Sequence, residues 1–122
     1  MFRVVHFEIG AYDTGKISKF YSDVFGWKMQ KWGEGEQEYI LVSTGDQKDM
    51  GIDGGIFKRK DGPALINTIS VSNLDEMCKK VEAAGGIIIT QKMTIPGIGW
   101  MVYFKDVEGN QSGMLQPDAG AK

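Results

Sequence analysis

The sequence has little of several residue types, and each shortage narrows what the protein can be. Its 122 residues include one cysteine, one histidine and three prolines. The cysteine, Cys78, cannot form a disulfide within the chain, and its place among helix-periodic apolar residues predicts a buried thiol. No apolar run approaches the roughly 20 residues of a membrane span, and the first residues turn polar too soon for a secretory signal. We therefore expect a cytoplasmic protein without a membrane contact.

An excess of charge of either sign is also missing. The 14 basic and 16 acidic side chains are interspersed and leave a formal net charge of −2, so nothing indicates a nucleic-acid partner. Phosphate-loop, dinucleotide-binding and C-x-x-C motifs do not occur, which excludes the usual nucleotide and iron–sulfur sites. The short basic run Lys58-Arg59-Lys60 is expected to be a solvated surface rather than a grip for an anion. We expect the partner to be a small molecule.

What the sequence does have is a clear pattern within one compact domain, residues 1–122. In the first half, 3–58, Val5, Phe7 and Ile9 alternate with polar residues, which is the period of a strand. Apolar residues at helical spacing follow, from Ile17 to Phe25, with Asp13 or Thr14 as N-cap and Gly26 as C-terminal stop. Three further strands are predicted at 27–32, 37–43 and 51–58, the first two joined by the turn at 33–36.

The same order returns after a connector at 59–64. In the second half, 65–117, a strand at 65–71 precedes a helix over Leu74 to Ala84, with Asn73 and Glu76 as a capping box. Strands are predicted at 86–90, 99–105 and 110–116, and Asp106 to Gly109 form a tight turn rather than a calcium loop. The stretch from Met93 to Trp100 is expected to be a loop, either overhanging a pocket or merely connecting. The fold class is α+β, with two βαβββ modules.

Four phrases in this order resemble the vicinal oxygen chelate superfamily, which includes glyoxalase I, bleomycin resistance proteins and extradiol dioxygenases. They are Val5 to Ile9, Phe20 to Trp27, Gly54-Gly55-Ile56 and Asp106 to Asn110. The resemblance covers Val4 to Gln116 and implies a mixed sheet curled into a cup, with both helices on its convex side. It also implies a homodimer.

Relatives in that superfamily hold a divalent metal with about four side chains, from the first and fourth strands of each half. His6 matches the first of these positions. The other positions fall near Gly55 or Ile56, at Ile66 or Asn67, and at Gly113, and these residues are poor ligands. We expect no cofactor, with His6 as a metal ligand only if a metal is present.

His6 and Glu8 are two residues apart on one strand and project to the same face. A carboxylate beside an imidazole can support acid–base chemistry, so we assign these two residues as candidate catalytic groups. The alternative is that His6 is a polar residue satisfied by a neighbour. Candidate ligand-binding residues, mostly aromatic, are Trp32, Tyr39, Thr68, Trp100 and Tyr103.

Two functions follow from these features. The first is a glyoxalase-like domain that binds a small organic molecule and acts as a lyase or isomerase through His6 and Glu8. The second is a non-catalytic protein that sequesters a drug or metabolite between aromatic walls, as bleomycin resistance proteins do. A third possibility, an assembly module without a ligand, predicts that pocket substitutions have no effect.

Overall fold

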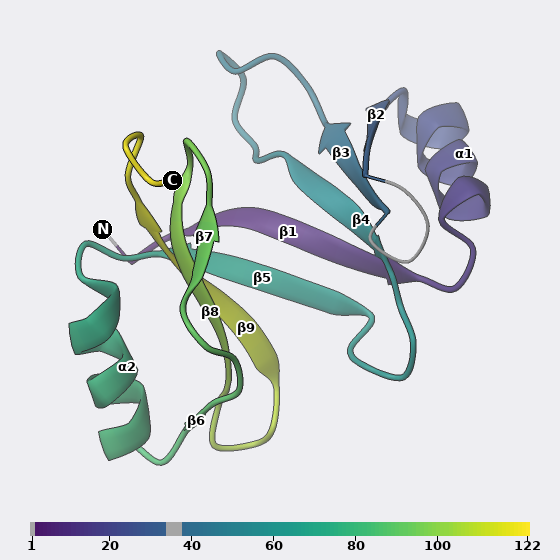
Figure 1. Ribbon diagram of the computed structural model, residues 1–122. Helices are drawn as coiled ribbons and strands as arrows, with labels where there is room; N and C mark the ends of the chain where they lie inside the picture. The colour runs from purple at the N-terminus through teal and green to yellow at the C-terminus, as the bar shows by residue number, and fades with distance from the viewer. Residues whose placement is uncertain (1, 34–37) are drawn as a thin grey trace. The chain divides into compact units, whose positions relative to one another are not determined.

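The computed structural model describes residues 2–33 and 38–122, and so leaves the predicted turn at 33–36 largely outside the described residues. Its elements in chain order are β1 (Val4–Ala11), α1 (Thr14–Phe25), β2 (Lys28–Trp32), β3 (Tyr39–Ser43), β4 (Gly54–Lys58), β5 (Leu65–Ser70), α2 (Leu74–Ala83), β6 (Ile87–Ile88), β7 (Met93–Ile95), β8 (Gly99–Lys105) and β9 (Gln111–Pro117) (Figure 1). No helix in the described ranges is long and apolar enough to cross a membrane.

The chain divides into two compact units. The first unit is His6–Ile66, and the second unites Asn67–Lys122 with the first residues of the chain. The predicted connector, 59–64, lies inside the first unit. There the Arg59 N–H donates to the Ala11 carbonyl and the Gly10 N–H donates to the Ala64 carbonyl. The division therefore falls within β5 rather than in the connector.

In the first unit the strand order is β2-β3-β4-β1. The pair β1/β4 is parallel, and the other neighbours are antiparallel. α1 packs against β2 and β4 on one face (Figure 1). The buried core of this unit is Ala11, Ile40, Val42 and Ile56. Alternate residues of each strand supply this core because successive side chains of a strand point to opposite faces.

α1 begins and ends where its sequence predicts. The Asp13 side chain accepts a hydrogen bond from the Lys16 N–H, and Gly26 takes a left-handed conformation with φ of 72°. The N-cap carboxylate and the C-terminal glycine allow hydrogen bonds to N–H and C=O groups at the helix ends that have no partner within the helix.

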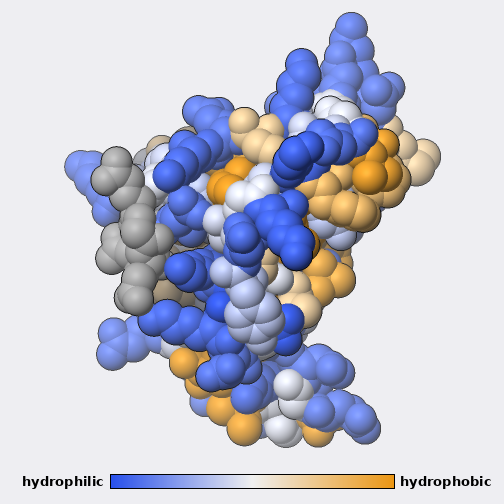
Figure 2. Space-filling view, turned by 90° about the vertical axis from the view of Figure 1, so that its right-hand side faces the viewer, coloured by the Kyte–Doolittle hydropathy of each residue, from blue (hydrophilic) through white to orange (hydrophobic). Residues whose placement is uncertain are grey.

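Only part of the apolar stripe of α1 faces the core. No residue of the helix is fully buried, and Phe20, Val24 and Phe25 are exposed. Ile17 reaches the core, and Tyr21 instead stacks on Trp27, with 4.9 Å between ring centroids. The apolar arc is wider than the strip of sheet that the helix covers. Figure 2, which looks at the side of the molecule that carries α1, accordingly shows apolar atoms at the surface between hydrophilic side chains.

The second unit repeats this plan, with strand order β5-β9-β8-β6 and α2 packed against β6, β8 and β9. Its core is Val71, Leu74, Val102 and Met114. Asn73 caps α2 by accepting from the Glu76 N–H at 3.0 Å. The turn at Asp106 to Gly109 is confirmed as structural, because the Asp106 carboxylate accepts from the Glu108 and Asn110 amides, and these hydrogen bonds lower its pKa.

The prediction of a loop from Met93 to Trp100 is partly wrong. Met93–Ile95 form β7, which pairs antiparallel with Gly99–Met101 of β8. Gly97, with φ of 76°, reverses the chain between these strands, and glycine tolerates this left-handed conformation without steric cost. β6 and β7 share one edge of β8, so β6 keeps only two residues of the strand predicted at 86–90.

Candidate functional site

The candidate site residues of the first unit lie on the face of its sheet that is opposite α1. On β1, Phe7 and Ile9 pack with the α1-side core, so His6 and Glu8 point the other way. The strand register then places Gly55 beside Glu8, and Trp32 beside Tyr39. We call this surface the open face of the first unit.

Tyr39 lies across the middle of the open face because Gly55 has no side chain. A Cβ atom built on Gly55 would stand 2.0 Å from the Tyr39 hydroxyl oxygen and 2.1 Å from its Cζ. Any other residue at position 55 would therefore collide with the phenol. The ring is thus seated on bare backbone at the centre of the sheet.

From this position the Tyr39 hydroxyl forms a hydrogen bond with His6. The Tyr39 Oη and His6 Nε2 atoms are 2.9 Å apart. If the imidazole carries its proton on Nδ1, the phenol donates to Nε2, and in the other tautomer Nε2–H donates to the phenol oxygen. The predicted candidate His6 and the predicted candidate Tyr39 are therefore in direct contact.

The His6 imidazole is shifted towards its neutral form. Burial lowers its pKa below the ordinary value of 6.5, because desolvation disfavours the charged ring. The carboxylates of Glu8 and Asp53 act in the opposite direction and raise the pKa, but their effect is smaller. Glu8 is 7% exposed, while Asp53 is held by the Thr44 amide at 2.9 Å. A neutral imidazole at neutral pH can accept a proton.

An exposed aromatic edge borders this polar centre. Trp32 meets the Tyr39 ring edge to face, with 6.4 Å between centroids and an interplanar angle of 87°. Its side chain remains 61% exposed, so its indole surface is accessible to a ligand. Four of the seven predicted site residues, His6, Glu8, Trp32 and Tyr39, thus lie together on the open face.

Thr68 and Tyr103 belong to the second unit, where they share the sheet face opposite α2. Both are in register with Gly113 of β9, Thr68 from the parallel strand β5 and Tyr103 from the antiparallel strand β8. The Tyr103 N–H donates to the Thr90 hydroxyl at 2.9 Å, which fixes this part of β8.

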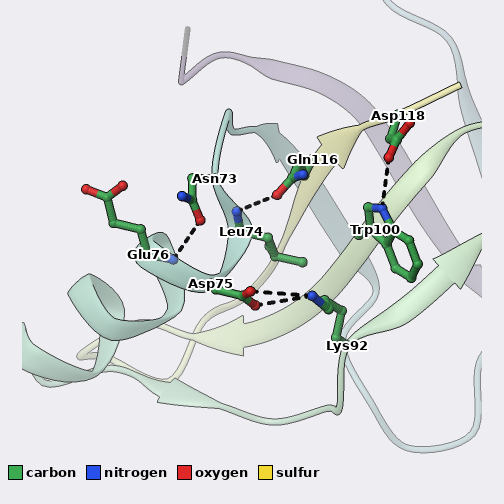
Figure 3. Close-up of polar contacts among 8 residues, drawn as sticks. All are labelled: Asn73, Leu74, Asp75, Glu76, Lys92, Trp100, Gln116 and Asp118. Atoms are coloured by element: carbon green, nitrogen blue, oxygen red, sulfur yellow. Dashed lines mark hydrogen bonds and ion pairs between the residues drawn. The ribbon is translucent and has the colours of Figure 1, made fainter. Parts of the chain in front are cut away.

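Trp100 lies on the other face of β8, where it packs against the core beneath α2. Its indole N–H donates to the Asp118 carboxylate at 3.2 Å, and the Lys92 ammonium stands over its ring at 5.4 Å (Figure 3). Lys92 also approaches the Asp75 carboxylate at 3.4 Å. The structure therefore does not bring Trp100 together with Tyr103, because alternate residues of a strand face opposite ways.

The donors on the open face do not fit the four-ligand metal site that the resemblance implies. His6 Nε2 is engaged by Tyr39, and the phenol covers Gly55, where a ligand from β4 would have to project. Among residues 2–33 and 38–122, no group of three or more His, Cys, Asp or Glu side chains is placed to hold an ion. Divalent cations need several such donors converging on one point.

Two site residues escaped the sequence reasoning. The sequence placed Gly55 near a position where relatives hold a metal ligand but did not predict its contact with Tyr39, although consecutive glycines within a strand can mark the close approach of another group. Asp53 contributes through its charge on His6. It precedes β4 in a loop, and no spacing relates it to β1.

Comparison with known proteins places this geometry in context. Residues 3–45 match the family described as Bleomycin resistance protein-like N-terminal. A glyoxylase-like domain-containing protein from Didymella fabae is 28% identical, with 84% of each chain covered.

Solved structures show the same fold. A glyoxalase/bleomycin resistance/dioxygenase superfamily member from Vibrio splendidus 12B01 has a TM-score of 0.65 at 16% identity, covering 93% of this chain and 97% of that one. Methylmalonyl-CoA epimerase from Mycobacterium tuberculosis has a TM-score of 0.67 at 16% identity, covering 94% and 87%. The predicted α+β fold and the resemblance drawn from the sequence are confirmed.

The state of His6 can be measured directly, because it is the only histidine of the chain. An NMR titration of its ring protons should give a pKa below 6.5, and Glu8→Gln should lower it further by removing a charge that favours the imidazolium. Glu108→Gln, in the exposed turn, is the control and should leave it unchanged. Because the unfolded chain binds this proton more readily, the free energy of unfolding should fall as pH drops below about 6.5. A pKa at or above 6.5 would contradict the assignment.

The contact between the Tyr39 ring and the backbone of Gly55 can be tested with two glycine substitutions. Gly55→Ala should displace the phenol, break its hydrogen bond to His6 and lower the free energy of unfolding by about 1–3 kcal/mol. Gly45→Ala should change it by less than about 0.5 kcal/mol, because nothing lies within 4 Å of the added carbon. Urea unfolding measures both. Equal stabilities for the two variants would show that the ring does not depend on Gly55.

Proposed function

From the glyoxalase/bleomycin resistance/dioxygenase fold of this chain, we propose that it binds a small organic molecule on the open face of its first unit and catalyses a proton transfer there, as an isomerase or lyase. The observation that carries this proposal is the hydrogen-bonded His6–Tyr39 pair, with its imidazole pKa lowered by burial. A general base works best when its neutral form prevails near the operating pH.

The roles of the residues follow from their chemistry. His6 accepts a proton from a carbon or oxygen of the ligand, and Tyr39 holds the ring and can pass a proton through its hydroxyl. Glu8, on the same face of β1, stabilises the imidazolium that forms, as its effect on the His6 pKa indicates. Trp32 gives the ligand an apolar surface on which to lie.

A relative with the same fold supports the reaction class. The structurally similar protein from Mycobacterium tuberculosis is named as a methylmalonyl-CoA epimerase. Inverting a carbon that stands beside a carbonyl is most simply achieved by removing and returning a proton, which is the chemistry a neutral histidine can perform. The present chain would carry out such a step with His6 and Tyr39, and without the metal that the donor set does not accommodate.

Sequestration is the second candidate, and a separate observation favours it. The Trp32 indole is largely exposed and meets Tyr39 edge to face. Two rings arranged in this way can hold a planar compound without any chemistry. The match of residues 3–45 to a bleomycin resistance-like family is in keeping with this role.

Proton exchange distinguishes these functions. In deuterated buffer, the wild-type protein should accelerate loss of the α-proton signal of methylmalonyl-CoA in NMR spectra, and His6→Asn should reduce the rate about 100-fold or more. Trp32→Ala should weaken binding of the same compound, whereas Phe20→Ala, which removes another exposed aromatic ring on α1, should not.

The remaining outcomes are also informative. Binding of bleomycin that Trp32→Ala abolishes and His6→Asn preserves, without any proton exchange, would establish sequestration instead. Catalysis that is fully retained in His6→Asn would refute the role proposed for the histidine.

A further inference from the structure

Helix α1 carries an apolar strip that remains at the surface of the first unit. Phe20 and Val24 are one turn apart, and their side chains are 54% and 56% exposed. The strip continues into the aromatic cluster beside it, because the Phe20 ring meets the Tyr21 ring edge to face with 5.2 Å between centroids. By contrast, none of the ten residues of α2 is an exposed large hydrophobic residue. Contiguous apolar surface of this kind marks an interaction site.

The charges of α1 are arranged against its own dipole. Its first turn contains Lys16 and no acidic residue, and its last turn contains Asp23 and no basic residue. A helix has partial positive charge at its N-terminus and partial negative charge at its C-terminus, so both side chains stand at the unfavourable end. α2 has the favourable order, with Asp75 and Glu76 in its first turn and Lys80 in its last. An antiparallel helix with the charges of α1 would supply the missing complement at both ends.

The apolar strip and the two charges share one face of α1. Lys16, Phe20, Asp23 and Val24 follow one another at spacings of four, three and one, which places them on a single helical stripe. If two such stripes meet in antiparallel orientation, Phe20 faces Phe20 of the second copy, and Lys16 faces Asp23. Twofold symmetry makes the charged contact occur twice. Lys19 already binds one oxygen of the Asp23 carboxylate, and a carboxylate can accept from two ammonium groups.

We propose that α1 pairs in antiparallel orientation with α1 of a second copy of this chain, with Phe20 at the twofold axis. Apolar contact supplies the affinity, and the charges select the orientation, because a parallel pair would bring Lys16 onto Lys16 and Asp23 onto Asp23. Two crossing helices bury less than the roughly 1,600 Å² of a standard interface, so the pairing is reversible. α1 lies opposite the open face, and the pairing therefore does not depend on the function proposed for His6.

The experiment measures self-association of the full-length protein by sedimentation equilibrium, at concentrations from about 1 µM to about 1 mM. Lys16→Asp and Asp23→Lys each place like charges opposite each other, and the double variant restores opposite charges in the reverse order. Lys79→Asp makes the same change of charge at an exposed position of α2 and is the matched control. Thermal unfolding is measured on each protein at the lowest concentration.

The wild type should form a dimer with a Kd on the order of 10 µM. Each single variant on α1 should weaken association about tenfold or more, and the double variant should return to within about threefold of the wild type. Lys79→Asp should leave the Kd unchanged. In the dilute protein, Lys16→Asp should keep or raise Tm, because an acidic residue suits the first turn of a helix. Its loss of association would then not be caused by unfolding.

Three results would overturn the proposal. A wild type that stays monomeric at about 1 mM would exclude a second copy as the occupant of this face. A dimer whose Kd is the same in Lys16→Asp and Asp23→Lys as in the wild type would be formed through another surface. A double variant that associates no better than the single variants would exclude the antiparallel arrangement.

Discussion

The approach of the Tyr39 ring to the backbone of Gly55 is the contact on which the polar centre of this protein depends. β3 and β4 are antiparallel neighbours, so a side chain at position 55 would occupy the space that the phenol fills. With glycine there, the hydroxyl reaches His6 Nε2 at 2.9 Å. The same contact covers the backbone position from which the superfamily resemblance would draw a metal ligand. The small residue Gly55 thus makes room for the phenol–imidazole pair.

Burial then determines the charge of that pair. Removing the imidazole from water disfavours its protonated form, and this outweighs the attraction of the Glu8 and Asp53 carboxylates. The two carboxylates still matter, because they limit the lowering of the His6 pKa and would stabilise the imidazolium during a reaction. A histidine whose neutral form is favoured in this way can accept a proton from a bound ligand, as proton-transfer chemistry requires.

Much of the fold could be predicted from sequence because its signals are local. Alternation from Val5 to Ile9 identifies β1, and Asp13, Gly26 and Asn73 mark helix ends through bonds made within a few residues. The same alternation correctly placed His6 and Glu8 on one face. The repeat of these signals about 60 residues later revealed the second module.

Other features depend on partners that are distant in sequence. β7 exists because β8 is long enough to pair with two short strands, which no local pattern in Met93–Ile95 reveals. Trp100 lies beneath α2 because alternate residues of β8 share a face, and Val102 and Phe104 also face the helix. The hydrogen bond of Tyr39 to His6 spans 33 residues and requires Gly55 from a third strand. Aromatic composition alone therefore indicated a binding surface but could not identify which aromatic residues lie on it.

Calorimetric titration with Zn²⁺ most directly tests the claim that the open face holds a phenol–imidazole pair in place of a metal. The account predicts no saturable binding at one ion per chain for the wild type, and no difference from His6→Asn. Tight binding of one ion that His6→Asn abolishes would contradict it, because the imidazole would then serve as a metal ligand and the Tyr39 contact would have to yield.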